Sequence, residues 1–111
     1  MKVNSLRRNK KYMKLITAIV RPVVLDRLIV GLEEIEDFPG LTVTEASGFG
    51  QRIREGIRDT IDPFRANKRV EIAAPDEMVE RVVSVIRSCA HTGRKGDGIV
   101  LVGPLESTVL I

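Results

Sequence analysis

Cysteine and histidine are nearly absent from this 111-residue chain, which holds one of each, Cys89 and His91. A lone thiol cannot form an intramolecular disulfide or supply the paired cysteines of a metal chaperone. Cys89 falls on the apolar face of an expected helix and His91 at its end, so the two do not form a nucleophile–base pair. No paired carboxylate motif is present. We expect a protein of the reducing cytoplasm that is not an enzyme and has no metal site.

Aromatic residues make up only 4% of the chain. All four, Tyr12, Phe38, Phe49 and Phe64, lie outside the expected strands, so the base-stacking platform of an RNA-recognition sheet is missing. No apolar run approaches the roughly 20 residues of a membrane-spanning helix, and the N-terminus lacks the apolar stretch of a signal peptide. These absences predict that the protein neither binds nucleic acid nor inserts into a membrane.

Positive charge is concentrated at the N-terminus. Residues 1–12 hold five basic residues and no acidic one, so the formal net charge of +3 leaves residues 13–111 at −2. We interpret residues 1–12 as a disordered basic extension, with Met13 as an alternative start, and residues 13–111 as one folded domain.

Hydrophobic periodicity predicts the order β-α-β, long loop, β-α-β. A shift of 53 residues places Pro22 on Pro75 and relates the two halves. Two such halves give an α+β, ferredoxin-like βαββαβ fold, in which two helices cover one face of an antiparallel sheet. The other face must then be covered by self-association. The strands are expected at 14–20, 41–47, 69–74 and 99–102.

Two segments with helical spacing of apolar residues lie between these strands. The first begins at Leu25 and is expected to end near residues 36–40, with Gly31 weakening it by up to about 1 kcal/mol relative to alanine. The second is expected to begin at Asp76, whose side chain is predicted to act as the N-cap.

Two glycine-rich segments border the expected strands, Gly48–Gly50 and residues 92–98. Glycine permits positive φ and close backbone approach, so amide groups there can face an anion. Arg94 and Lys95 add positive charge to the second segment. Neither matches a phosphate-loop or dinucleotide motif, and each alone is also typical of a plain turn. Together they are consistent with one anion site, most simply in a cleft between subunits.

Residues 48–67 show no periodicity and are long for a structureless connection. Two interpretations remain open, a solvated mobile loop and an arm that docks on a partner. The mobile part is expected at 51–67. Its candidate partner-binding residues are Arg54, Arg58, Phe64 and Arg65.

Four segments in this order resemble the nitrogen regulatory PII signalling family: MKLITAIVRP (13–22), GLTVTEASGFG (40–50), VEIAAPDEM (70–78) and TGRKGDG (92–98). The resemblance runs from Met13 to about Val102. It implies a homotrimer of ferredoxin-like subunits that binds ATP or ADP in the clefts between subunits. It also implies that the long loop contacts target enzymes or transporters.

The resemblance further implies which residues form the nucleotide site. Thr42 and the backbone of Leu41 and Ala73 are expected near adenine, in a cleft that Ile19 also lines. Glu71 is expected on the ribose side. The full set of implied nucleotide-binding residues is Ile19, Leu41, Thr42, Gly48, Phe49, Gly50, Gln51, Arg52, Glu71, Ala73, Arg94, Gly96, Asp97 and Gly98.

The chain departs from the family pattern where basic residues contact phosphate. Ile99 stands in place of a lysine, Leu110 in place of the first arginine of an Arg-x-Arg strand, and the chain ends at Ile111 before the second. Each lost charge-assisted contact removes about 1.5–3 kcal/mol of binding energy. Arg52 and Asn67 replace a glutamine and a lysine that serve 2-oxoglutarate binding, so we do not expect 2-oxoglutarate sensing.

We therefore expect a divergent PII-like regulator that requires no cofactor. ATP, ADP and AMP are the candidate effectors of a weakened site, and a transporter or metabolic enzyme is the expected partner of loop 51–67. The alternatives are a pure protein-interaction module that has lost nucleotide binding, and a regulator that responds to a small anion such as bicarbonate or to a metal.

Overall fold

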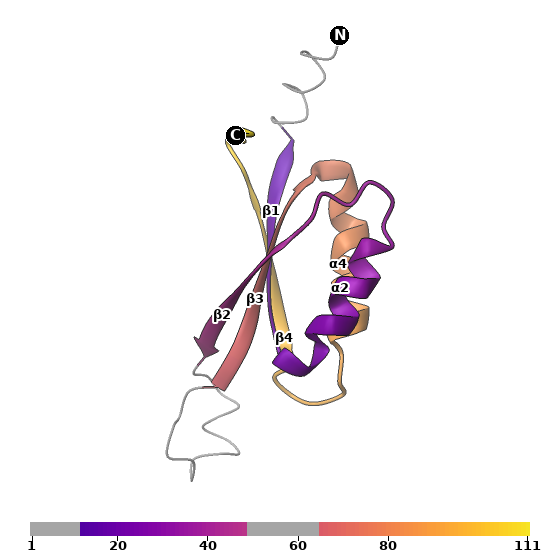
Figure 1. Ribbon diagram of the computed structural model, residues 1–111, viewed down its shortest axis with the longest axis vertical. Helices are drawn as coiled ribbons and strands as arrows, with labels where there is room; N and C mark the ends of the chain where they lie inside the picture. The colour runs from indigo at the N-terminus through magenta and orange to yellow at the C-terminus, as the bar shows by residue number, and fades with distance from the viewer. Residues whose placement is uncertain (1–11, 49–64) are drawn as a thin grey trace.

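The computed structural model describes residues 12–48 and 65–111. They form a four-stranded antiparallel sheet with two helices on one face (Figure 1), which confirms the expected ferredoxin-like fold. Strand order is β2-β3-β1-β4, so β2 and β4 form the edges. The elements are β1 (Met13–Val20), η1 (Pro22–Val24), α2 (Leu25–Glu33), β2 (Thr42–Gly48), β3 (Arg65–Pro75), η2 (Asp76–Met78), α4 (Val79–Ala90) and β4 (Gly98–Pro104).

The expected basic extension and most of loop 51–67 lie outside the described residues. Residues 65–67, which the sequence analysis placed in the loop, instead belong to β3, where they pair with the end of β2. Neither helix in the described part of the chain has the length and apolar character needed to cross a membrane.

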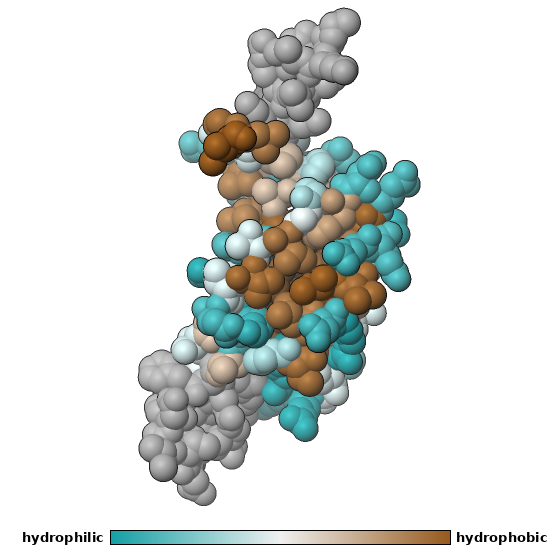
Figure 2. Space-filling view, viewed as in Figure 1, coloured by the Kyte–Doolittle hydropathy of each residue, from teal (hydrophilic) through white to brown (hydrophobic). Residues whose placement is uncertain are grey.

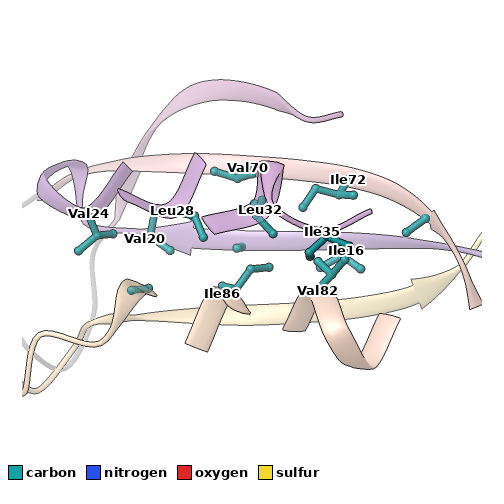
Figure 3. Close-up of a cluster of buried hydrophobic side chains, with 13 residues drawn as sticks. Ile16, Val20, Val24, Leu28, Leu32, Ile35, Val70, Ile72, Val82 and Ile86 are labelled. Atoms are coloured by element: carbon teal, nitrogen blue, oxygen red, sulfur yellow. The ribbon is translucent and has the colours of Figure 1, made fainter. Parts of the chain in front are cut away.

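The hydrophobic core lies between the helices and one face of the sheet (Figure 3). Alternate residues of the two central strands, β1 and β3, are buried because successive side chains of a strand point to opposite faces. Burying one Val, Leu or Ile side chain contributes about 1.5–3 kcal/mol. No polar side chain is buried among the described residues. The core residues are Ile16, Ala18, Val20, Val24, Leu28, Leu32, Ile35, Val70, Ile72, Ala74, Val82, Ile86 and Ala90.

The two helices approach each other closely at Gly31. A Cβ atom there would lie 2.8 Å from Sγ of Cys89 and 3.2 Å from a methyl group of Val85. Glycine at this position lowers the helix propensity of α2, but it lets α2 pack closely against α4. Arg27 of α2 also donates hydrogen bonds to the carbonyl oxygens of Cys89 (2.6 Å) and His91 (3.3 Å). These bonds satisfy carbonyl groups that the end of α4 leaves without helical partners.

The first helix ends earlier than the sequence analysis expected. It stops at Glu33 rather than near residues 36–40. Ile35 remains in the core although it lies beyond the helix, and Asp37 adopts a left-handed conformation with φ of 63°. The apolar spacing therefore predicted correctly that Ile35 is buried. It lies in the turns that follow the helix and not in the helix itself.

The prediction that Asp76 caps the second helix is wrong. The 3-10 turn η2 separates β3 from α4, so Asp76 lies inside this turn and α4 begins at Val79. Pro75 occupies the capping position of the turn, and no side chain caps it. The carboxylate of Asp76 instead lies 3.1 Å from Nζ of Lys14 in β1.

The sheet face opposite the helices is bare in a single protomer (Figure 1). Strand register places Ile19 opposite Ile99 and Leu15 opposite Gly103 on this face, and Leu101 lies two residues beyond Ile99. Ile99 and Leu101 are 53% and 50% exposed. An apolar strip across β1 and β4 therefore faces water, as expected for a surface that another copy of the chain covers.

The first residue of β4 occupies a position that suits only glycine. Gly98 has φ of 145°, and a Cβ atom there would lie 2.1 Å from the carbonyl oxygen of Ile19. Such a contact forces the backbone of β4 away from β1 at the point where residues 92–98 join the sheet.

We expect Gly98→Ala to lower the free energy of unfolding by about 2 kcal/mol or more, because the methyl group meets backbone that cannot move freely. Gly103→Ala is the matched control in the same strand, since a Cβ atom at Gly103 would meet nothing within 4 Å. Its effect should be clearly smaller than that of Gly98→Ala, because no backbone of the same protomer lies in the way. Urea denaturation followed by circular dichroism measures both, and equal stability of the two variants would contradict the assigned strain.

Candidate functional site

A hollow of about 810 Å³ lies at the end of the sheet where β2 begins. We call it the β2 hollow. Four residues that the family resemblance placed near adenine and ribose line it together: Leu41, Thr42, Glu71 and Ala73. Strand pairing explains the grouping, because Thr42 of β2 lies opposite Glu71 of β3. The other lining residues are Met13, Pro39, Gly40, Pro75, Thr108, Val109 and Leu110.

The lining of the β2 hollow is largely apolar and contains no basic side chain. Its polar side chains are the hydroxyl groups of Thr42 and Thr108 and the carboxylate of Glu71. The C-terminal segment adds an apolar wall at this end of the molecule (Figure 2), with Val109 and Leu110 78% and 89% exposed. These walls suit a flat, uncharged ring with a few hydrogen-bonding groups, and they offer nothing to neutralise phosphate.

Ile19 is not among the residues that line the β2 hollow, and its place in a cleft between subunits stays a prediction. It lies on the bare sheet face opposite Ile99. Gly48 ends β2 and pairs with Arg65 at the start of β3. The remaining predicted residues, Phe49, Gly50, Gln51, Arg52, Arg54, Arg58 and Phe64, lie outside the described part of the chain.

Asp97 organises residues 92–98, which we call the β4 loop. Its Oδ2 accepts a hydrogen bond from the backbone N–H of Thr92 (2.7 Å), and its Oδ1 accepts from the Thr92 hydroxyl and from Nε of Arg21 (3.0 Å). Arg21 also donates to the carbonyl oxygen of Lys95 (2.9 Å). The Thr92 hydroxyl in turn accepts from the N–H of Arg94 (3.2 Å). The loop is thus held in one shape by its own residues and one arginine of the β1–η1 junction.

These contacts lower the pKa of Asp97 from 3.8 to about 2, with the hydrogen bonds from Thr92 as the main cause and Arg21 as a further one. Asp97 is therefore ionised at any physiological pH. His91 Nδ1 lies 3.7 Å from the same carboxylate. Because its carboxylate is bonded to other residues of the loop, Asp97 fixes the positions of the neighbouring glycines. The positive charge of the loop comes from Arg94 and Lys95.

The β2 hollow and the β4 loop lie at opposite ends of the sheet, because Met13 at the start of β1 lines the hollow, whereas the loop joins the sheet at Gly98, opposite Val20 at the end of β1. A single protomer therefore cannot bring the two together around one ligand. They can meet around one ligand only where two copies of the chain adjoin.

Sequence reasoning missed Arg21 and the C-terminal lining residues Thr108 and Val109. Arg21 lies 76 residues from Asp97, and no local pattern signals their contact. Apolar residues at the C-terminus carried no recognisable motif. Within the described residues, no group of three histidine, cysteine, aspartate or glutamate side chains is arranged to hold a metal ion.

Comparison with known proteins identifies relatives along almost the whole chain. The family model described as nitrogen regulatory protein P-II matches residues 13–111. The nitrogen regulatory protein P-II of Azospirillum brasilense is 39% identical over 104 residues, covering 89% of this chain and 91% of the relative. That of Bradyrhizobium diazoefficiens is 38% identical over the same length and coverage.

A solved structure agrees with the sequence relatives. The crystal structure of Arabidopsis thaliana PII bound to citrate is similar with a TM-score of 0.70 and 32% identity, covering 86% of this chain and 78% of that one. Sequence and fold both confirm the resemblance found in the four motifs. The chain belongs to the nitrogen regulatory protein P-II family, whose members are regulatory signalling proteins rather than enzymes.

Proposed function

We propose that this regulatory protein binds an adenine nucleotide in the clefts of a homotrimer and signals its occupancy to a target protein through loop 51–67. The observation that carries the proposal is the grouping of Leu41, Thr42, Glu71 and Ala73 around one hollow. A trimer is consistent with membership of the P-II family.

The chemistry of the β2 hollow supports a nucleoside as the part of the ligand that it holds. Leu41 and Ala73 supply apolar surface for a purine ring, and the Thr42 hydroxyl can both donate and accept a hydrogen bond. The Glu71 carboxylate, as an acceptor, suits the hydroxyl groups of a ribose. Sites of this kind bind through apolar walls and a few well-placed polar groups.

The phosphate side of the proposed site is weaker. A pre-ordered β4 loop costs little entropy when an anion binds, which favours affinity. Its basic residues, however, are only Arg94 and Lys95, both exposed. Ile99, which replaces the family's lysine, contributes to the apolar strip of the bare face. Affinity should therefore depend on the base and ribose more than on the number of phosphates.

A small carboxylate is the second candidate effector. The observation in its favour is that the related Arabidopsis PII was crystallised with citrate bound. In this chain a compact anion would rely on the β4 loop alone, without the β2 hollow, so its binding should not change when the hollow is altered.

We expect ATP, ADP, AMP and adenosine to bind with dissociation constants within about tenfold of one another, since the β2 hollow contains no cation. Isothermal titration calorimetry at physiological salt measures this, with citrate as the fifth ligand. Thr42→Val should weaken all four adenine ligands about fivefold, the usual effect of losing one neutral hydrogen bond.

The matched control is Thr44→Val, on the same strand face but outside the hollow, where the hydroxyl accepts a bond from Arg69 (3.3 Å). This variant should bind like the unmodified protein. Absence of binding by all five ligands would overturn the proposed effector site. A steep gain of affinity with each added phosphate would refute the dominance of base and ribose.

The order of the β4 loop predicts how Asp97 titrates. Its folded-state pKa of about 2 lies below the ordinary 3.8, so the stabilisation it provides is present above pH 4 and is lost as pH falls toward 2. Carboxyl-detected NMR titration should give a midpoint near 2. Thr92→Val, which removes the largest contribution, should raise the midpoint toward 3.8. Thr92→Ser keeps the hydroxyl and should leave it low; equal midpoints in the two variants would exclude the assigned cause.

A further inference from the structure

A second pocket, of about 410 Å³, lies where the end of α4 meets the start of β4. We call it the α4 pocket. It shares no lining residue with the β2 hollow. Its apolar lining comes from both helix and sheet: Val20, Val83, Ile86, Ala90 and Val100, with Ile99 at the border to the bare face. Its size lies at the lower end of the range of ligand sites, so it suits a molecule smaller than a nucleotide.

Arg87 is the charged group of the α4 pocket that favours an anion. Arg87 and His91 line it, and both are exposed at the end of α4. Asp97 also lines it, but its carboxylate is already engaged by Thr92 and paired with Arg21. No hydrogen bond or ion pair engages the Arg87 guanidinium within the described part of the chain. Arg87 is therefore the uncompensated charge beside an apolar lining.

Neighbouring groups do not cancel this charge. Two carbonyl groups at the end of α4, those of Cys89 and His91, accept hydrogen bonds from Arg27, which reduces the partial negative charge that they present. Among the described residues that line the pocket, the one carboxylate is Asp97, and it is paired with Arg21. Arg87 is therefore the lining charge that is left for a ligand.

We propose that the α4 pocket binds a small aliphatic monocarboxylate. The carboxylate would pair with Arg87, which can donate two parallel hydrogen bonds to it, and His91 would lie beside the pair. The hydrocarbon part would pack against Val83, Ile86 and Val100. Asp97 and Gly98 form part of the same lining, so a bound acid contacts the β4 loop from the helix side, away from the β2 hollow.

The test uses the intact protein and 4-methylpentanoate as the probe, with 4-methylpentanamide as its uncharged counterpart. Calorimetry should show saturable binding of the acid. The amide should bind at least about tenfold more weakly. Arg87→Gln should reduce the affinity for the acid by about tenfold or more and leave the amide unchanged. Arg81→Gln is the matched control, because Arg81 is exposed on the same helix but does not line the pocket.

Three results would overturn the proposal: no binding of the acid, equal binding of acid and amide, or equal effects of Arg87→Gln and Arg81→Gln. Displacement of the acid by adenosine would also overturn it, because adenosine has no phosphate to reach the β4 loop and the acid would then occupy the β2 hollow. Adenosine binding measured on the same sample separates the two proposals. The α4 pocket can fail while the nucleotide site stands, and the reverse also holds.

Discussion

A four-stranded sheet has two faces, and the two helices of this chain cover only one of them. The covered face holds the whole core, from Ile16 in β1 to Ala90 at the end of α4. The other face presents aliphatic side chains of β1 and β4 to water, with Ile99 and Leu101 about half exposed. Burial of such surface is the main favourable term in association. Assembly with further copies is therefore the condition on which the proposed function depends.

The separation of the β2 hollow and the β4 loop follows from the same topology. They lie at opposite ends of the sheet, so each protomer offers one half of a site at either end. The loop is ordered before any partner arrives, because Arg21 and Thr92 hold Asp97 in place. The hollow is shaped by the turn before β2 and by the C-terminal segment. A ligand that touches both halves would report on the contact between protomers, which is a useful property in a regulatory protein.

Sequence periodicity was sufficient to predict the order of elements and the covered face, because alternation in strands and helical spacing are local properties. It failed where distant segments decide the outcome. From the sequence, Gly31 is only a residue of low helix propensity. The structure shows why glycine stands there, because a Cβ atom at this position would lie 2.8 Å from Sγ of Cys89. Asp76 is a residue type that often caps helices. Here it lies in the turn η2, and its carboxylate forms an ion pair with Lys14. The role of Arg21 depends on its contact with Asp97, 76 residues away in the sequence, and local spacing of residues cannot predict such a contact.

The most direct test of the account is the mass of the protein in solution, measured by sedimentation equilibrium without ligand. Burial of the bare sheet face predicts three times the chain mass of 12.3 kDa. Leu101→Lys places a charge in that face and should shift the mass toward the monomer. Val23→Lys, at an apolar residue of the turn η1 that is 79% exposed and lies outside the strands, should not. A stable monomer in the unmodified protein, or the same mass for both variants, would contradict the account.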